Sequence, residues 1–223
     1  MISPERLDGL QAGWVRLLAR FSVSPADAYP LFDRLVAAHG EPHRHYHTLE
    51  HVGEVLKVAG RLADAAADPA AVQLAIWFHD TIYDPRASDN EVASAALAVA
   101  SLQPLGLPAA TLAHVAAMID ATAHTTAGEV DADTAVLLDA DLAILSAEER
   151  RYARYAADIA LEYAWDEAEE YRAGRLRVLE GFLARPRIYR TERMHAAAED
   201  AARRNLRAEI ERHRVRRIEL SRQ

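Results

Sequence analysis

The apolar residues of this chain recur at the spacing of an α-helix rather than with the alternation of a β-strand. The segment that begins near His47 shows this pattern clearly. Its apolar residues share one helical face and are Val52, Val55, Leu56 and Ala59. No alternating stretch of β-branched residues and no internal repeat is visible. The pattern predicts an all-α protein.

Short polar signals divide this pattern into separate helices. Ser3 and Ser24 each precede a proline, which is typical of a helix cap followed by Pro in the first turn. The sequence from Ser146 to Glu149 predicts a capping box at the start of a long eighth helix. We expect helices at about 4–21, 25–39, 47–59, 69–78, 89–102, 108–124 and 131–145, an eighth from 146 and a last one from 191.

Composition narrows the class of protein. The 223 residues are 51% hydrophobic and 27% charged, which is typical of a globular chain. We expect a single domain over 1–223 whose segment after about 146 is a C-terminal helical extension. The net charge of −8 argues against nucleic-acid binding. Glu5 and Asp8 stand where a signal peptide needs positive charge, and no apolar run is long enough for a membrane span, so we expect a cytoplasmic protein without a membrane partner.

Histidines cluster in one short segment. Five of the ten histidines lie between residues 39 and 51, namely His39, His43, His45, His47 and His51. We expect a loop that enters a helix, with His47 and His51 on one face at a spacing of four residues. Because the chain has no cysteine, any metal must be held by His, Asp and Glu side chains. Chance clustering on a surface loop is the simpler alternative.

Two further polar groups interrupt strongly apolar helices. His79 and Asp80 end the run Ala75-Ile76-Trp77-Phe78, where an unpaired carboxylate is costly. Neighbouring residues on a helix point about 100° apart, so the two side chains can share a site only at a frayed helix end or where two ions are bridged. Asp139 and Asp141 lie within another apolar helix and need a cation or an arginine partner. A structural His–Asp cap, an Arg–Asp pair and simple exposure of one aspartate to solvent are the alternatives.

The order of these groups resembles the HD superfamily of metal-dependent phosphohydrolases. The residues that carry the resemblance are Tyr46-His47-x-x-x-His51, His79-Asp80 and Ala140-Asp141-Leu142. The opening motif is similar to that of the class I cyclic nucleotide phosphodiesterases. The wider sequence, over about residues 40–210, is similar to a small bacterial family of predicted HD phosphohydrolases, through Phe78-His79-Asp80-x-x-Tyr83-Asp84, Asn90-Glu91, Glu162-Tyr163, Gly174-Arg175, Ile188-Tyr189 and Ala202-Arg203-x-Asn205-Leu206.

The resemblance implies an HD-type helical bundle with its metal-site core at about 40–145. Its implied ligands of a divalent cation (Mn, Fe, Co, Ni, Zn or Mg) are His51, His79, Asp80 and Asp141. His47 would be a general acid for the leaving oxygen or a phosphate contact. The implied substrate is a small phosphorylated metabolite or a nucleotide.

Three further residues are weaker candidates for the same site. Glu91 is a candidate for positioning the attacking water or holding a second metal, and His124 for a second ion. Arg175 is a candidate phosphate clamp, because a guanidinium matches phosphate oxygens. A solvated Glu, a histidine at a helix C-terminus and a surface Arg are the simpler interpretations.

The chain departs from these families at two positions. Tyr83 stands where the phosphodiesterases have a further histidine, so specificity for cyclic nucleotides is not implied. Ala160 stands where the bacterial family is expected to have an arginine, which puts a substrate contact there in doubt.

Three other functions fit parts of the sequence, and a purely structural role fits it least. His47-Thr48-Leu49-Glu50-His51 also matches a zinc-protease motif with Glu50 as the base, although the strands of a protease fold are absent from the pattern. A metal- or nucleotide-binding module without turnover uses the same ligands. An HD-fold di-iron oxygenase needs extra ligands such as Glu91 and His124. A purely structural helical scaffold has no use for the buried His and Asp groups.

Overall fold

A computed structural model describes residues 2–124 and 128–220, with side chains through Val215. The described residues form ten α-helices and no β-strand, which confirms the all-α prediction. The helices are α1 (Pro4–Ala19), α2 (Pro25–Ala38), α3 (Leu49–Arg61), α4 (Pro69–Phe78), α5 (Asn90–Leu102), α6 (Ala109–Ala121), α7 (Ala132–Asp141), α8 (Glu149–Glu162), α9 (Ala168–Ala184) and α10 (Glu192–Leu220). None of the helices in these ranges has the length and apolar character needed to cross a bilayer.

The chain divides into two compact units, Met1–Ala140 and Asp141–Gln223. The boundary falls at the end of α7, so Asp141 continues a helix whose other residues belong to the first unit. A short 3-10 helix, η3 (Leu142–Ser146), follows directly. The expected start of a helical extension, at about residue 146, lies at the end of η3. That the whole chain is a single domain stays a prediction.

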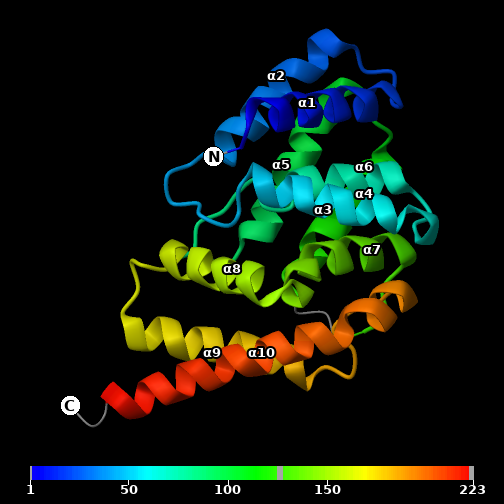
Figure 1. Ribbon diagram of the computed structural model, residues 1–223. Coiled ribbons are helices and arrows are strands. Elements are labelled where there is room, and N and C mark those ends of the chain that lie inside the picture. The colour runs from blue at the N-terminus through cyan, green and yellow to red at the C-terminus, as the bar shows by residue number, and fades with distance from the viewer. Residues whose placement is uncertain (1, 125–127, 221–223) are drawn as a thin grey trace. The chain divides into compact units, whose positions relative to one another are not determined.

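Helix α4 forms the centre of the first unit. Eight of its ten residues are buried, and it packs against α1, α3, α5 and α6. Trp77 makes an edge contact with Trp14 at a centroid distance of 5.4 Å and with Phe32 at 5.8 Å. The Trp14 indole Nε1 donates a hydrogen bond to the Ala28 carbonyl at 2.9 Å, which joins α1 to α2 (Figure 1, blue). Aromatic contacts of this kind hold the C-terminal end of α4 in place.

Side-chain caps begin the first helices where the sequence predicts them. The Ser3 hydroxyl accepts a hydrogen bond from the Arg6 amide, and the Ser24 hydroxyl accepts one from the Asp27 amide. Asp68 caps α4 by accepting from two backbone amides of its first turn, at 3.0 and 3.1 Å. These caps satisfy backbone donors that a helix start leaves open.

The sequence-based boundaries are wrong in the region after α7. The expected long eighth helix is two helices, α8 and α9, because residues 163–167 form turns; the Tyr163 carbonyl accepts from the Asp166 amide at 3.0 Å. The capping box is also wrong: Glu148 is the N-cap of α8 without a side-chain hydrogen bond, and the Ser146 hydroxyl donates to the Ala143 carbonyl instead.

In the second unit, α9 and α10 lie side by side (Figure 1, yellow to red) and bury an ion pair between them. The Arg175 guanidinium donates to the Glu209 carboxylate through Nε at 2.8 Å and Nη2 at 3.2 Å. Tyr152 of α8 donates its hydroxyl to the same carboxylate at 2.5 Å, and Arg175 Nη1 donates to the Tyr155 hydroxyl at 3.3 Å. The network ties three helices together through buried polar groups.

This network makes the stability of the protein depend on pH. Burial alone would raise the pKa of the Glu209 carboxyl, but hydrogen bonds from His213, Arg175 and Tyr152 and the charge of Arg175 lower it to about 2. A carboxyl with a lowered folded-state pKa stabilises the fold above its unfolded pKa and loses that contribution as the pH falls. We therefore expect the urea midpoint to drop as the pH is lowered from about 4.5 towards about 2.

Glu209→Gln is the matched variant for this titration. The substitution removes the charge of the Glu209 carboxylate, so we expect a lower urea midpoint than that of the native chain at pH 7. The difference between the native chain and Glu209→Gln should therefore shrink on acidification. A constant difference between pH 7 and pH 2.5 would contradict this assignment.

Candidate metal centre

His79 and Asp80 lie directly after the last residue of α4, in the turn that ends it. The His79 amide still donates to the Ala75 carbonyl at 2.9 Å, so His79 is the C-cap of the helix. Its ring Nδ1 lies 2.8 Å from the Ile76 carbonyl. Because a carbonyl only accepts, Nδ1 carries the proton, and the lone pair of the neutral ring is on Nε2. This is the arrangement in which a histidine is oriented to bind a metal through Nε2.

His51 supplies a second imidazole from the first turn of α3. Thr48 caps this helix, and its hydroxyl accepts from the Glu50 amide at 3.3 Å. The His51 ring is buried, and its Nε2 lies 3.3 Å from Nε2 of His79. Two histidine nitrogens therefore face each other across a short gap.

Two carboxylates complete the group. Asp80 Oδ2 lies 3.0 Å from Nε2 of His79 and 3.5 Å from Nε2 of His51. Asp141, the last residue of α7, has a carboxylate oxygen within 4.8 Å of a ring nitrogen of each histidine. His51, His79 and Asp141 form the group that could hold a metal ion, and the Asp80 carboxylate lies against both histidines. Two imidazoles and two carboxylates are donors that suit a divalent first-row metal.

The Asp80 carboxylate is ionised at neutral pH. Burial alone would raise its pKa, but the positive charges that His79 and His47 carry when protonated, and the hydrogen bond that a protonated His79 ring donates, keep the pKa well below the usual range. The side chain is 18% exposed, compared with 1% for His79 and 2% for His51. The group therefore has a buried histidine side and a carboxylate open to solvent.

The five clustered histidines have different surroundings. His39 is buried, its Nδ1 donates to the Leu35 carbonyl at 2.9 Å, and burial, with the nearby charge of Arg44, lowers its pKa to about 3. His43 is exposed, and its Nε2 donates to the Tyr83 carbonyl at 2.8 Å. Only His51 of the five belongs to a metal-holding group among the described residues.

His47 lies before the helix rather than on it, because α3 begins at Leu49. The expectation that His47 and His51 share a helical face is therefore wrong. Their ring centroids are nevertheless 5.8 Å apart, and the His47 ring lies 4.3 Å from that of Tyr83. The charge of His47 also acts on Asp80. His47 thus lies beside the candidate centre on a loop.

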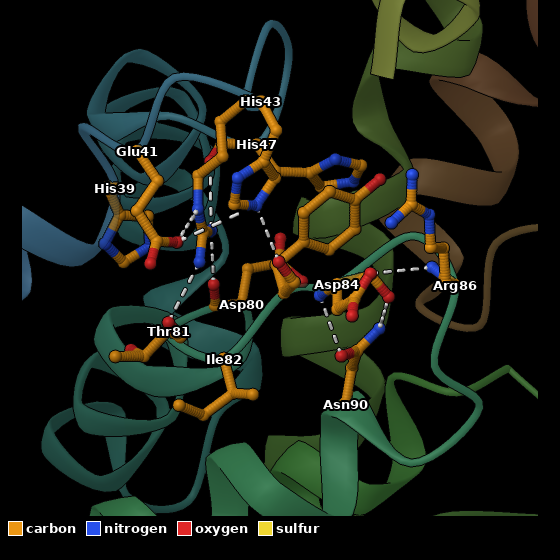
Figure 2. Close-up of polar contacts among 12 residues, drawn as sticks. His39, Glu41, His43, His47, Asp80, Thr81, Ile82, Asp84, Arg86 and Asn90 are labelled. Atoms are coloured by element: carbon orange, nitrogen blue, oxygen red, sulfur yellow. Dashed lines mark hydrogen bonds and ion pairs between the residues drawn. The ribbon is translucent and has the colours of Figure 1, made fainter. Parts of the chain in front are cut away.

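The turn that carries His79 and Asp80 is held by side chains of α5. The Asn90 amide nitrogen donates to the Asp84 carbonyl at 2.8 Å, and its oxygen accepts from the Asp84 amide at 3.0 Å (Figure 2). The Ser94 hydroxyl accepts from the Ile82 amide at 3.0 Å. Sequence reasoning noted Asn90 only as part of the resemblance and missed Ser94, which carries no sequence signal of its own.

The three weaker candidates are not brought into this group. Glu91 lies in the first turn of α5, and His124 follows α6 with a left-handed backbone, φ 55°. Neither belongs to a metal-holding group among the described residues. Arg175 is in the second unit, where Glu209 and Tyr155 accept hydrogen bonds from its guanidinium. Their predicted roles in water positioning, second-metal binding and phosphate binding stay predictions.

A second group, unforeseen from the sequence, joins His114, Asp131 and Asp133. Its carboxylates already have structural partners. Asp133 accepts from the Asp68 amide at 2.9 Å and lies 3.0 Å from Nε2 of His114. Asp131 accepts from the amide and the hydroxyl of Thr134, both at 2.9 Å, at the start of α7. These contacts explain the group as a capping network.

Comparisons with protein-family models, curated proteins and solved structures find no match for this chain. The function must therefore be argued from the site itself.

Proposed function

We propose that this protein is a metal-dependent phosphohydrolase of the HD type that acts on a small phosphorylated metabolite or a nucleotide. The observation that carries the proposal is the convergence of His51, His79 and Asp80 at 3.0–3.5 Å, with the His79 tautomer set for ligation. Asp141 lies close to the same histidines. The order of these residues along the chain is the one that the HD resemblance implies.

The set of potential metal ligands also distinguishes the proposed function from the protease and oxygenase interpretations. The zinc-protease interpretation needs His47 and His51 as paired ligands, whereas the group that contains His51 joins it to His79 and Asp141. The oxygenase interpretation needs Glu91 and His124, and neither belongs to that group among the described residues. A binding module without turnover uses the same ligands, so a turnover assay is needed to separate it from a hydrolase.

In the proposed reaction, a divalent metal held by His51, His79, Asp80 and Asp141 would lower the pKa of a bound water and neutralise charge on the phosphoryl group. His47 would supply a proton to the leaving oxygen, because an imidazole titrates near neutral pH. Its place at the partly exposed edge of the group, beside Tyr83, suits a residue that meets substrate.

The proposal is tested by phosphate release from tag-free protein that is first stripped with EDTA and then loaded with Mn²⁺, Co²⁺, Zn²⁺ or Mg²⁺. The substrates are p-nitrophenyl phosphate, nucleoside mono- and triphosphates, sugar phosphates and pyrophosphate. We expect release that depends on the added metal. A chain that binds metal and nucleotide but releases no phosphate from any of these substrates would favour the binding module.

His47→Ala tests the role of the acid. A general acid matters most when the leaving group is poor, so we expect kcat to fall by about 100-fold on an alkyl phosphate and by only a few-fold on p-nitrophenyl phosphate, with metal content unchanged. His45→Ala, an exposed neighbour in the same loop, is the matched control. Equal losses on the two substrates would assign His47 to phosphate binding instead.

A further inference from the structure

Arg44 is a buried cation beside the candidate metal centre. Its side chain has no exposed surface, although it lies in the loop that carries the histidines. The Nη1 group donates to the His47 carbonyl at 3.2 Å and to the Asp80 carbonyl at 2.6 Å. The Nη2 group donates to the Thr81 carbonyl at 2.9 Å. One guanidinium thus joins two segments that are 36 residues apart in the sequence.

The remaining contacts of Arg44 fix its orientation. Its Nε donates to the Glu41 carboxylate at 3.0 Å, which balances the buried charge at the edge of the loop (Figure 2 shows Glu41 and the acceptors Asp80 and Thr81). The guanidinium carbon lies 5.4 Å from the centroid of the Tyr83 ring. A planar fork of five donors can hold this geometry, whereas the single ammonium of a lysine is a point charge on a flexible stem.

Two of the three residues whose carbonyls accept from Arg44 are residues that the proposed function uses. Asp80 is a proposed metal ligand and His47 is the proposed acid, and Arg44 bonds the carbonyl of each. The bond from His43 to the Tyr83 carbonyl at 2.8 Å adds a second tie between the same two segments. The relative placement of acid and ligand is therefore set by backbone contacts rather than by the side chains that would meet substrate.

We propose that Arg44 is the positioning residue of this centre: it holds the His47 loop and the turn of Asp80 in one arrangement, so that the ligands and the acid are aligned before substrate arrives. The proposal rests on the proposed function for its catalytic part. Its structural part, the fixed pairing of the two segments, is independent of that function.

The test compares Arg44→Ala and Arg44→Lys with Arg34→Ala, an exposed arginine of α2. Far-UV circular dichroism checks that each variant is folded. Amide exchange by mass spectrometry is measured on metal-free protein over residues 43–48 and 79–84. Both segments contain hydrogen-bonded amides whose exchange can be followed, since the Thr81 amide donates to the Phe78 carbonyl and the Thr48 amide to the Tyr46 carbonyl. Co²⁺ titration measures metal affinity, and kinetics on p-nitrophenyl phosphate separates kcat from KM.

For Arg44→Ala we expect exchange about tenfold faster in these two segments and unchanged elsewhere. The Co²⁺ dissociation constant should rise by about 10–100-fold, as for loss of an outer-shell partner of a metal ligand. The loss of activity should fall on kcat rather than KM, and millimolar guanidinium should restore part of it. Arg44→Lys should give an intermediate result, and Arg34→Ala should behave as the native chain.

Native exchange in both segments of Arg44→Ala would overturn the proposal, as would native Co²⁺ affinity in a folded variant. Faster exchange over the whole chain would also overturn it, because that would show a general role in stability. If Arg44→Ala does not fold, the same criteria apply to Arg44→Lys. If the native chain binds no Co²⁺, the proposed function fails, and the exchange data alone decide whether Arg44 pairs the two segments.

Discussion

His79→Ala is expected to lose the metal and all metal-dependent turnover while the helical circular dichroism spectrum is kept. His79 supplies a ring nitrogen 3.3 Å from that of His51 and 3.0 Å from the Asp80 carboxylate, and its proton is fixed on the other nitrogen by the Ile76 carbonyl. Even loss of an outer-shell partner costs metal affinity about 10–100-fold, so removal of a ligand should cost more than about 100-fold. Co²⁺ titration and phosphate release measure the two losses.

His114→Ala is the informative control for this experiment. His114 belongs to the other group of potential ligands, with Asp131 and Asp133, whose carboxylates already accept structural hydrogen bonds. We expect this variant to keep native Co²⁺ affinity. Loss of Co²⁺ binding in His114→Ala, with native binding in His79→Ala, would move the metal to that group and contradict the proposed centre.

Arg175→Ala is expected to destabilise the protein by about 3–5 kcal/mol, because it leaves the buried Glu209 carboxylate without its cation. The side chains of Arg175 and Glu209 are 7% and 4% exposed, and two hydrogen bonds join them. Tyr152 and His213 would remain as partners of the carboxylate, but neither carries the permanent charge of a guanidinium. Urea unfolding followed by circular dichroism measures the change in the free energy of unfolding.

Two further variants separate charge from packing. Arg177→Ala changes an exposed arginine of the same helix and should shift stability by less than about 0.5 kcal/mol. The double variant Arg175→Met with Glu209→Leu removes both charges and should recover most of the loss, because a buried ion pair is often replaceable by apolar residues. A loss below about 1 kcal/mol in Arg175→Ala would show that Glu209 does not depend on Arg175.

The elements that local chemistry determines were predictable from the sequence. Ser3 and Ser24 predict the starts of α1 and α2, because a serine hydroxyl before a proline can accept a hydrogen bond from an unpaired backbone amide of the first turn. The apolar run that ends at Phe78 predicts a buried helix, and α4 is one. By contrast, the sequence does not predict the break between α8 and α9, because residues 163–167 include neither Gly nor Pro, the residues that most often indicate a turn.

The candidate site also contains some residues that the sequence predicts and others that it does not. The sequence singled out His79, Asp80 and Asp141 because such residues are costly in an apolar segment unless they are paired, and His51 because histidines cluster around it. The HD resemblance alone implied that the four are ligands of one metal. The sequence missed Arg44, because its acceptors are backbone carbonyls in a distant segment and every residue type has a carbonyl. It also placed His47 on a helix, since the spacing of four residues to His51 does not reveal that Thr48 begins α3. Long-range contacts to backbone atoms leave no pattern in a single sequence.

In the proposed centre, His51, His79, Asp80 and Asp141 hold a divalent metal. Elemental analysis by plasma mass spectrometry tests it most directly, on tag-free protein incubated with Mn²⁺, Co²⁺ and Zn²⁺ and then passed through gel filtration. We predict at least one stoichiometric divalent ion per chain in the native protein and none in His79→Ala. A native chain that leaves the column without stoichiometric metal, or a His79→Ala variant that keeps the native amount, would contradict the account.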